Sequence, residues 1–199
     1  MQKFTEIPYT RPDLDAFKRQ SLALIEQLEQ AGDAAQARQA LLKLQDLEAG
    51  VDTAVTLAHV RNTIDTTDAF YDAEMTFLNE ALPTLIPLQI RYLKALLACP
   101  HRAGLEEAFG SQLFSDAETE LKVQDEAIMG DKVEEANLRQ AYQKLTALCT
   151  TTFKGESVNF YGLLKHMEHP DRAHRREAYQ AWADLYAAHA DELDQQYDQ

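Results

Sequence analysis

The chain has 199 residues, of which 45% are hydrophobic, so it is long enough to bury one substantial core. Acidic residues outnumber basic residues by 33 to 19, which gives a formal net charge of −14. Such a surface repels nucleic acid and anionic membranes, so neither is expected as a partner. A solvated acidic face explains this charge more simply than attraction of a cationic ligand does.

The sequence shows no sign of secretion or membrane insertion. No apolar run approaches the ~20 residues that span a bilayer, and the first residues lack the apolar segment of a leader peptide. Neither Cys99 nor Cys149 belongs to a Cys-x-x-Cys motif. We interpret both as buried, reduced thiols on helices, and a disulfide between them stays open. These features predict a cytoplasmic protein.

The first half of the chain predicts long helices. Pro12 suits the first turn of a helix that Gly32 ends. Asp33 caps a longer helix, whose apolar stripe continues through Gly50 to Ala58. A long helix with one apolar stripe packs against its neighbours, so we expect a mainly α fold, a multi-helix bundle of long antiparallel helices.

Prolines divide the next helical stretch, residues 66–99. Pro83 and Pro87 predict a kink or break near residues 82–87, because each removes an amide donor and crowds the preceding turn. Three further helices are expected after it: a short one closed by Gly110, one from Ser115 through Met129, and one from Asp131 through Leu148.

The composition changes after these helices. β-Branched and aromatic residues surround Lys154-Gly155-Glu156, which predicts one small β-hairpin near residues 150–160. Asp171 then restarts a helix that is expected to run to the end of the chain, with Tyr179, Trp182 and Tyr186 at near-helical spacing. Because no repeat or linker interrupts the sequence, we expect a single helical domain over 1–199. The last helix lacks a stop signal, which favours a cut inside a longer protein over a finished chain.

Two histidines, His166 and His169, raise the question of a zinc site. The pattern H-E-x-x-H requires histidines four residues apart with a glutamate directly after the first, and both the spacing and the order fail here. His174 lies beyond Pro170, in the next expected helix, so a polar helix end before a proline turn explains these residues better. The nucleophile elbow, the phosphate loop, the dinucleotide fingerprint and the Glu-x-x-His motif of di-iron bundles are also absent from the sequence.

Residues 59–77 interleave charged and aromatic side chains. One interpretation is a junction between two helices, with Thr66 or Thr67 capping the second helix and Arg61 pairing with a carboxylate. The other is an acidic wall, including Asp65, Asp68 and Glu74, that faces a ligand.

Residues 153–182 also allow two interpretations. In the first, a hairpin packs on a helix start capped by Asp171, and Arg172, Arg175 and Arg176 are exposed. In the second, the edge of a strand binds an extended peptide through backbone pairing.

Four segments in this order resemble the oligoendopeptidase F family of zinc metallopeptidases, relatives of thimet oligopeptidase. They are YTRPDL, RNTIDTTDAFYDAE, LEEAFGSQLF with EEANLRQAYQKL, and FKGESVNFYGLLKHMEHPDRAHRREAYQAW, and together they span nearly the whole chain. The resemblance implies a longer, mainly helical, cytoplasmic enzyme with two lobes around a channel that admits short peptides. It places the zinc site, H-E-x-x-H with a further Glu, in the C-terminal lobe, where the motif Glu acts as base toward a zinc-bound water.

The chain matches only the N-terminal portion of that family and lacks its zinc motif. No catalytic and no metal-ligating residue is therefore predicted here, zinc is expected only in the full-length enzyme, and the sequence does not identify substrate-binding residues. One hypothesis is an N-terminal lobe that shapes the substrate channel and is inactive alone. Its expected partner is the C-terminal catalytic lobe, and short peptides are the expected partners of the full-length enzyme. The alternative is a stand-alone helical interaction domain that forms a homo-oligomer through an exposed apolar face. A deliberately expressed fragment and a naturally short reading frame both fit the first hypothesis.

Overall fold

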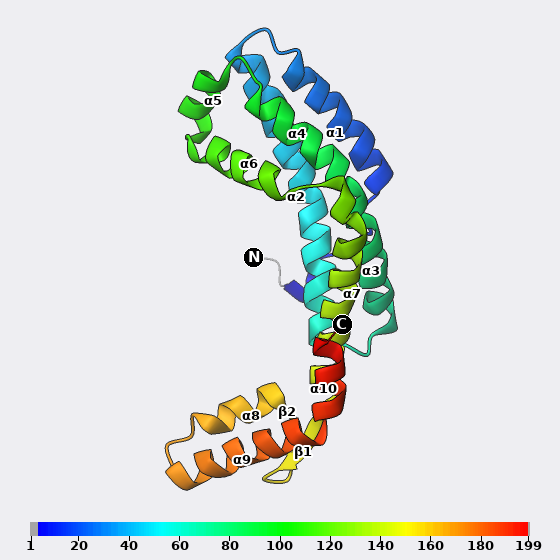
Figure 1. The fold of residues 1–199 in the computed structure, drawn as a ribbon, viewed down its shortest axis with the longest axis vertical. Helices are drawn as coiled ribbons and strands as arrows, with labels where there is room; N and C mark the ends of the chain where they lie inside the picture. The colour runs from blue at the N-terminus through cyan, green and yellow to red at the C-terminus, as the bar shows by residue number, and fades with distance from the viewer. Residues whose placement is uncertain (1–3, 199) are drawn as a thin grey trace. The chain divides into compact units, whose positions relative to one another are not determined.

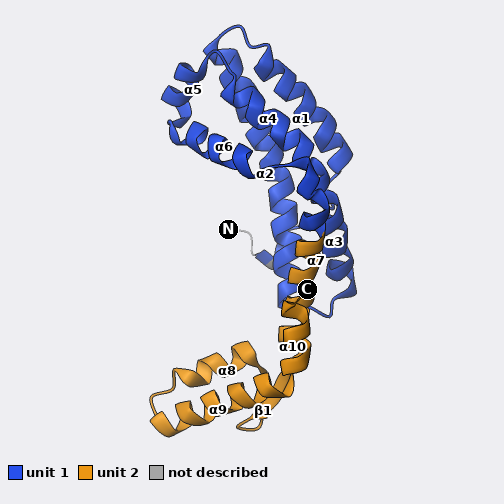
Figure 2. Ribbon diagram, viewed as in Figure 1, with its two compact units in different colours: residues 1–133 blue, residues 134–199 orange. Residues whose placement is uncertain are grey.

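A computed structural model of the protein describes residues 4–198 (Figure 1). Within this range the chain is mainly α-helical with one two-stranded sheet, which confirms the expected fold class. Two parts of the sequence-based predictions fall outside the described range. They are residues 1–3, at the start of the chain where no leader peptide is expected, and Gln199, the last residue of the expected C-terminal helix. The chain divides into two compact units, residues 1–133 (unit 1) and 134–199 (unit 2), as Figure 2 shows. The single domain over 1–199 stays a prediction.

Unit 1 is built from helices in its described part. These are η1 (Phe4–Glu6), α1 (Leu14–Glu29), α2 (Ala34–Ile64), α3 (Ala69–Ala81), η2 (Leu82–Leu85), α4 (Ile86–Leu97), α5 (Arg102–Phe109), α6 (Gln112–Val123) and η3 (Glu126–Ile128), followed by the start of α7 (Met129–Leu148). Helix α1 packs against α2 and α4, and α4 also packs against α6 (Figure 1).

Local sequence signals set most of these helix ends. The Asp33 carboxylate accepts a hydrogen bond from the Gln36 amide at 2.8 Å and starts α2, which runs through Gly50 as expected. Helix α1 ends at Glu29, before the expected stop at Gly32. The 3₁₀ turn η2 separates α3 from α4 in the proline-containing stretch, and Gly110, with φ of 85°, closes α5.

The helix expected over 115–129 differs from the observed one. Helix α6 begins at Gln112 and ends at Val123, so the sequence-based boundaries are wrong at both ends. Asp125 explains the early end, because its carboxylate accepts a hydrogen bond from the Ala127 amide at 2.9 Å and caps the separate turn η3.

The core of unit 1 lies between α1, α2, α4, α5 and α6. Its most deeply buried large side chains include Ile25, Leu28, Leu41, Leu105 and Phe114, each fully inaccessible to solvent. Helices α2 and α5 approach closely at Gly104, where a Cβ atom would lie only 2.6 Å from the Ala34 Cβ.

Unit 2 combines the hairpin with helices. Strands β1 (Thr150–Phe153) and β2 (Glu156–Asn159) pair antiparallel, and α8 (Phe160–Met167), α9 (Arg172–Ala188) and α10 (Ala190–Tyr197) follow. Lys154 and Gly155 form the two-residue turn with φ of 53° and 88°, the left-handed conformations that a tight hairpin requires. The predicted hairpin is therefore confirmed.

The last helical stretch of unit 2 is interrupted. Asp171 caps α9 as expected, through a 3.0 Å hydrogen bond from the Ala173 amide. The helix does not run on, however, because His189 leaves the helical conformation, with φ of −118° and ψ of 16°, and α10 starts after it. Helix α8 packs against β2 and α9, and α9 also packs against β1.

None of the helices between residues 4 and 198 combines the length and apolar character needed to cross a bilayer.

Candidate functional site

The junction between α2 and α3, residues 59–77, carries the first group of predicted site residues. Asp68 caps α3 by accepting hydrogen bonds from the Phe70 and Tyr71 amides at 2.8 and 3.3 Å. Capping by Thr66 or Thr67 was therefore wrong. Arg61 also differs from expectation, because it donates to the Tyr71 hydroxyl at 2.7 Å and to the Ile7 carbonyl rather than to a carboxylate.

Glu74 of this stretch is 3% exposed and is the centre of an internal network. The Arg11 Nε donates to its two carboxylate oxygens at 3.1 and 3.0 Å, and the Tyr9 hydroxyl donates at 2.6 Å. The Arg11 hydrogen bond lowers the pKa of Glu74, and the bond from Tyr9 acts in the same direction. Burial, followed by the hydrogen bond to Glu74, raises the pKa of Tyr9. Glu74 therefore ties the N-terminal segment to α3, and the acidic wall facing a ligand stays a prediction.

A second acidic group in unit 1, which sequence reasoning missed, lines a cavity of about 300 Å³ between α1, α2, α4 and α6. Glu48, Asp52 and Glu120 contribute carboxylates, and the buried Ser21 hydroxyl has no hydrogen-bond partner within the described residues. Burial raises the pKa of Glu48, and the charges of Asp52 and Glu120 raise it further. Carboxylates gathered in this way would attract a positively charged group.

Three histidines of unit 2 lie in and beside the turn between α8 and α9: His166 in α8, His169 in the turn and His174 in α9. His166 Nδ1 and His174 Nε2 are 3.1 Å apart, and the His169 ring stacks on that of His174 with centroids 4.0 Å apart. Burial, followed by the charges of His169 and His166, lowers the pKa of His174. Arg175 donates to the carbonyls of His169 and Pro170 at 2.7 and 2.8 Å. These contacts support the interpretation of a polar helix end before a proline turn.

For residues 153–182 the sequence predicts three exposed arginines and, alternatively, a strand edge that binds a peptide. Arg172 and Arg176 are exposed as expected, whereas Arg175 is half-buried by the turn that it stabilises. Peptide binding at a strand edge stays a prediction.

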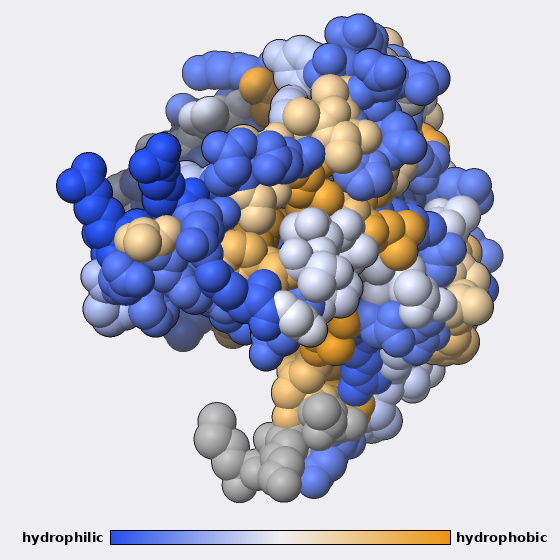
Figure 3. Space-filling view, turned by 90° about the horizontal axis from the view of Figure 1, so that it is seen from below, coloured by the Kyte–Doolittle hydropathy of each residue, from blue (hydrophilic) through white to orange (hydrophobic). Residues whose placement is uncertain are grey.

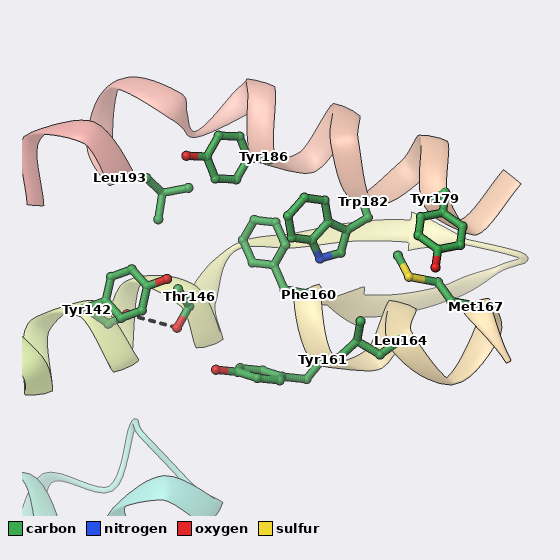
Figure 4. A pocket seen from close by; sticks show the side chains of 10 residues that line it. All are labelled: Tyr142, Thr146, Phe160, Tyr161, Leu164, Met167, Tyr179, Trp182, Tyr186 and Leu193. Atoms are coloured by element: carbon green, nitrogen blue, oxygen red, sulfur yellow. Dashed lines mark hydrogen bonds between the residues drawn. The ribbon is translucent and has the colours of Figure 1, made fainter. Parts of the chain in front are cut away.

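One concave surface of unit 2 is apolar. We call it the aromatic groove, a cavity of about 530 Å³ between α7, α8, α9 and α10 (Figure 4). Its lining residues are Tyr142, Thr146, Phe160, Tyr161, Leu164, Met167, Tyr179, Trp182, Tyr186 and Leu193. Hydrophobic residues likewise interrupt the hydrophilic surface in the view of Figure 3.

Aromatic rings give the groove its chemistry. The Trp182 ring meets the Phe160 ring edge-on at 5.5 Å and stacks on the Tyr186 ring at 5.8 Å. Tyr161 and Tyr179 keep 63% and 61% of their surface exposed. Such a groove suits an apolar or aromatic partner surface rather than acid–base chemistry. The near-helical spacing of Tyr179, Trp182 and Tyr186 was visible in the sequence, but the spacing alone does not show that this face stays open.

Solved structures similar to the chain carry peptidase or oligoendopeptidase names and are much longer than it. PZ peptidase A, solved with an inhibitor, is 33% identical with a TM-score of 0.89 and covers 98% of this chain. A protein provisionally called oligoendopeptidase F is 36% identical with a TM-score of 0.90, and one from Bacillus anthracis strain Ames is 29% identical with a TM-score of 0.90; both cover 100% of this chain. The chain spans only 35–36% of the length of these proteins. A search of curated proteins finds no match.

These similarities define the class of protein, a mainly helical domain that matches about one third of each of these longer proteins. Residues 4–124 match the family model described as the Peptidase M3 N-terminal domain, and the chain belongs to this family. The resemblance to the N-terminal region of oligoendopeptidase F proteins is thereby confirmed.

Proposed function

We propose that the chain forms the N-terminal lobe of a cytoplasmic, zinc-dependent oligopeptidase that hydrolyses short peptides. In this proposal the lobe shapes one wall of the substrate channel and has no peptidase activity by itself. The observation that carries the proposal is the similarity of at least 98% of the chain to about one third of each of three longer peptidase-type proteins. The absence of H-E-x-x-H from the sequence supports a division of labour, in which another portion holds the zinc and activates the water.

The aromatic groove supports this role. A surface with exposed tyrosines, Leu164 and the Trp182 ring is costly to leave in water, and contact with another protein surface would remove that cost. The catalytic lobe is the partner that we propose for it. Trp182 is the only tryptophan of the chain, so its fluorescence reports on the groove.

Peptidase assays test the proposal directly. The substrate is a quenched-fluorescence peptide of about ten residues, a length that suits an oligopeptidase rather than an enzyme for folded proteins. The purified chain with added zinc is expected to leave this peptide intact. Mixing the chain with the C-terminal portion of the 36%-identical relative, expressed without its own N-terminal third, is expected to produce cleavage and to shift the Trp182 emission. Zinc-dependent cleavage by the chain alone would overturn the proposal.

The groove also favours a second candidate function, a stand-alone interaction domain that forms a homodimer through this surface. Light scattering combined with size-exclusion chromatography separates the two candidates when it is repeated with the C-terminal portion present. A dimer that persists and excludes that portion supports the interaction domain. A monomer, or a dimer that the C-terminal portion dissociates, supports the peptidase lobe.

A further inference from the structure

Three metal-ligating side chains converge in unit 2, away from the histidines that the sequence analysis considered. Cys149 lies between the end of α7 and β1, His189 separates α9 from α10, and Glu192 lies in the first turn of α10. One potential ligand atom from each of them lies within 4.8 Å of the other two. Residues far apart in the sequence are thus brought to one point by the packing of α10.

We infer that Cys149, His189 and Glu192 form a binding site for one thiophilic divalent ion of the Zn²⁺ type. Sulfur, imidazole nitrogen and carboxylate oxygen are the ligands that proteins use for zinc, whereas Mg²⁺ and Ca²⁺ prefer oxygen alone. Zinc–ligand distances of about 2.0–2.3 Å place tetrahedral ligand atoms roughly 3.5 Å apart, so small side-chain rotations suffice to close the site. Water would complete the coordination.

The arrangement of burial suits the entry of an ion from solvent. Cys149 is 2% exposed and forms the base of the site, while the His189 and Glu192 side chains are 31% and 62% exposed at its rim. His189 Nδ1 lies 3.0 Å from a Glu192 carboxylate oxygen. This contact already brings two of the ligands together, and an ion that binds between them displaces the proton of this hydrogen bond and the thiol proton of Cys149 to solvent.

The bound ion would fasten α10 to the start of the hairpin. Cys149 belongs to the apolar core of unit 2, together with Phe153, Leu185 and Leu193. An ion that links Cys149 to the α9–α10 turn adds a direct tie across this core, which is the action of a structural metal. The inference does not depend on the proposed peptidase function, and the ion plays no part in peptide cleavage.

Cobalt substitution gives the sharpest test, because a thiolate bound to Co²⁺ produces a charge-transfer absorption that imidazole and carboxylate ligands do not. The metal-free full chain is titrated with Co²⁺, and then with Zn²⁺ in competition with a chromophoric chelator. We expect one ion per chain and the thiolate absorption. Cys149→Ser is expected to abolish the absorption and to weaken Zn²⁺ binding at least about 100-fold, beyond what loss of an outer-shell partner costs. Cys99→Ser, which also changes a buried thiol, is the matched control and should keep both.

Variants at the rim keep the test decisive if Cys149→Ser fails to fold. His189→Gln and Glu192→Gln are each expected to weaken Zn²⁺ binding at least about 10-fold, whereas Asp191→Asn changes a neighbouring carboxylate and should have no effect. The inference is overturned if the chain binds neither ion. It is also overturned if Co²⁺ binds without the thiolate absorption, or if His174→Gln abolishes binding while His189→Gln does not.

Discussion

The hydrophobic cores of unit 1 and unit 2 differ in size and in the side chains that lie beside them. In unit 1, Leu41 and Phe114 are fully buried in a core enclosed by five helices. In unit 2, the core around Leu163 is smaller, and Tyr161 and Tyr179 remain more than half exposed beside it. Burial of apolar surface is the main favourable term in folding, so Leu41 and Phe114 contribute to the stability of unit 1, whereas Tyr161 and Tyr179 remain available to a partner of unit 2.

The largest expected effect tests the closed core of unit 1. Leu41→Ala removes a fully buried side chain from α2 and should lower the free energy of unfolding by about 3 kcal/mol, through lost burial and the cavity that it leaves. The adjacent Leu42, which is 41% exposed, is the matched control, and Leu42→Ala should change this free energy by less than about 0.5 kcal/mol. Urea unfolding monitored by circular dichroism measures both. Equal effects at the two positions would show that the core is not closed as described.

An intermediate effect is expected from the charged network of unit 1. Glu74→Ala leaves the Arg11 and Tyr9 side chains without their shared acceptor, and should lower the free energy of unfolding by about 2 kcal/mol at pH 7. Because the Arg11 hydrogen bond lowers the pKa of Glu74 in the folded state, the stabilisation is present above the pKa of an unfolded glutamate. It is lost as the pH falls through the lower folded-state pKa.

The pH profile separates this effect from loss of packing. Glu74→Gln keeps the size of the side chain but cannot ionise, so its free energy of unfolding should change less between pH 7 and pH 3 than that of the original chain. Glu80 lies on the same helix and takes no part in the Glu74–Arg11–Tyr9 network, so Glu80→Gln serves as the control. If the free energy of unfolding of Glu74→Gln depends on pH as that of the original chain does, ionisation of Glu74 does not contribute to the stability at pH 7 relative to pH 3.

The sequence predicted the parts of the fold that depend on local signals. Asp33, Asp171, Gly110 and the Lys154–Gly155 turn act within a few residues of themselves, and the structure confirms each of them. The end of α6 was missed because a cap at Asp125, close to the next helix, competes with a continuing helical pattern. The break at His189 was also missed, because no proline or glycine at that point of the sequence indicates the end of a helix.

Contacts between residues far apart in the chain depend on tertiary packing, and the sequence did not predict them. Glu74 and Arg11 are far apart in the chain, and nothing in either segment indicates that the two side chains pair. Cys149 and His189 converge in the same way, through the placement of α10. The family resemblance was visible because it rests on ordered segments along the whole chain. Which surface stays open depends on the arrangement of α8 and α9, and helical spacing does not contain that information.

The smallest effect on stability is expected in the aromatic groove, where the comparison between the units is sharpest. Tyr161→Ser should change the free energy of unfolding by less than about 0.5 kcal/mol, because this side chain is mostly exposed already. It should nevertheless weaken the binding of an apolar fluorescent dye, measured by energy transfer from Trp182. Tyr197 is 90% exposed and does not line the groove, so Tyr197→Ser is the matched control and should leave dye binding unchanged. If Tyr161→Ser instead destabilises unit 2 as strongly as a core substitution, Tyr161 is part of the core, and the two units do not differ in the way proposed.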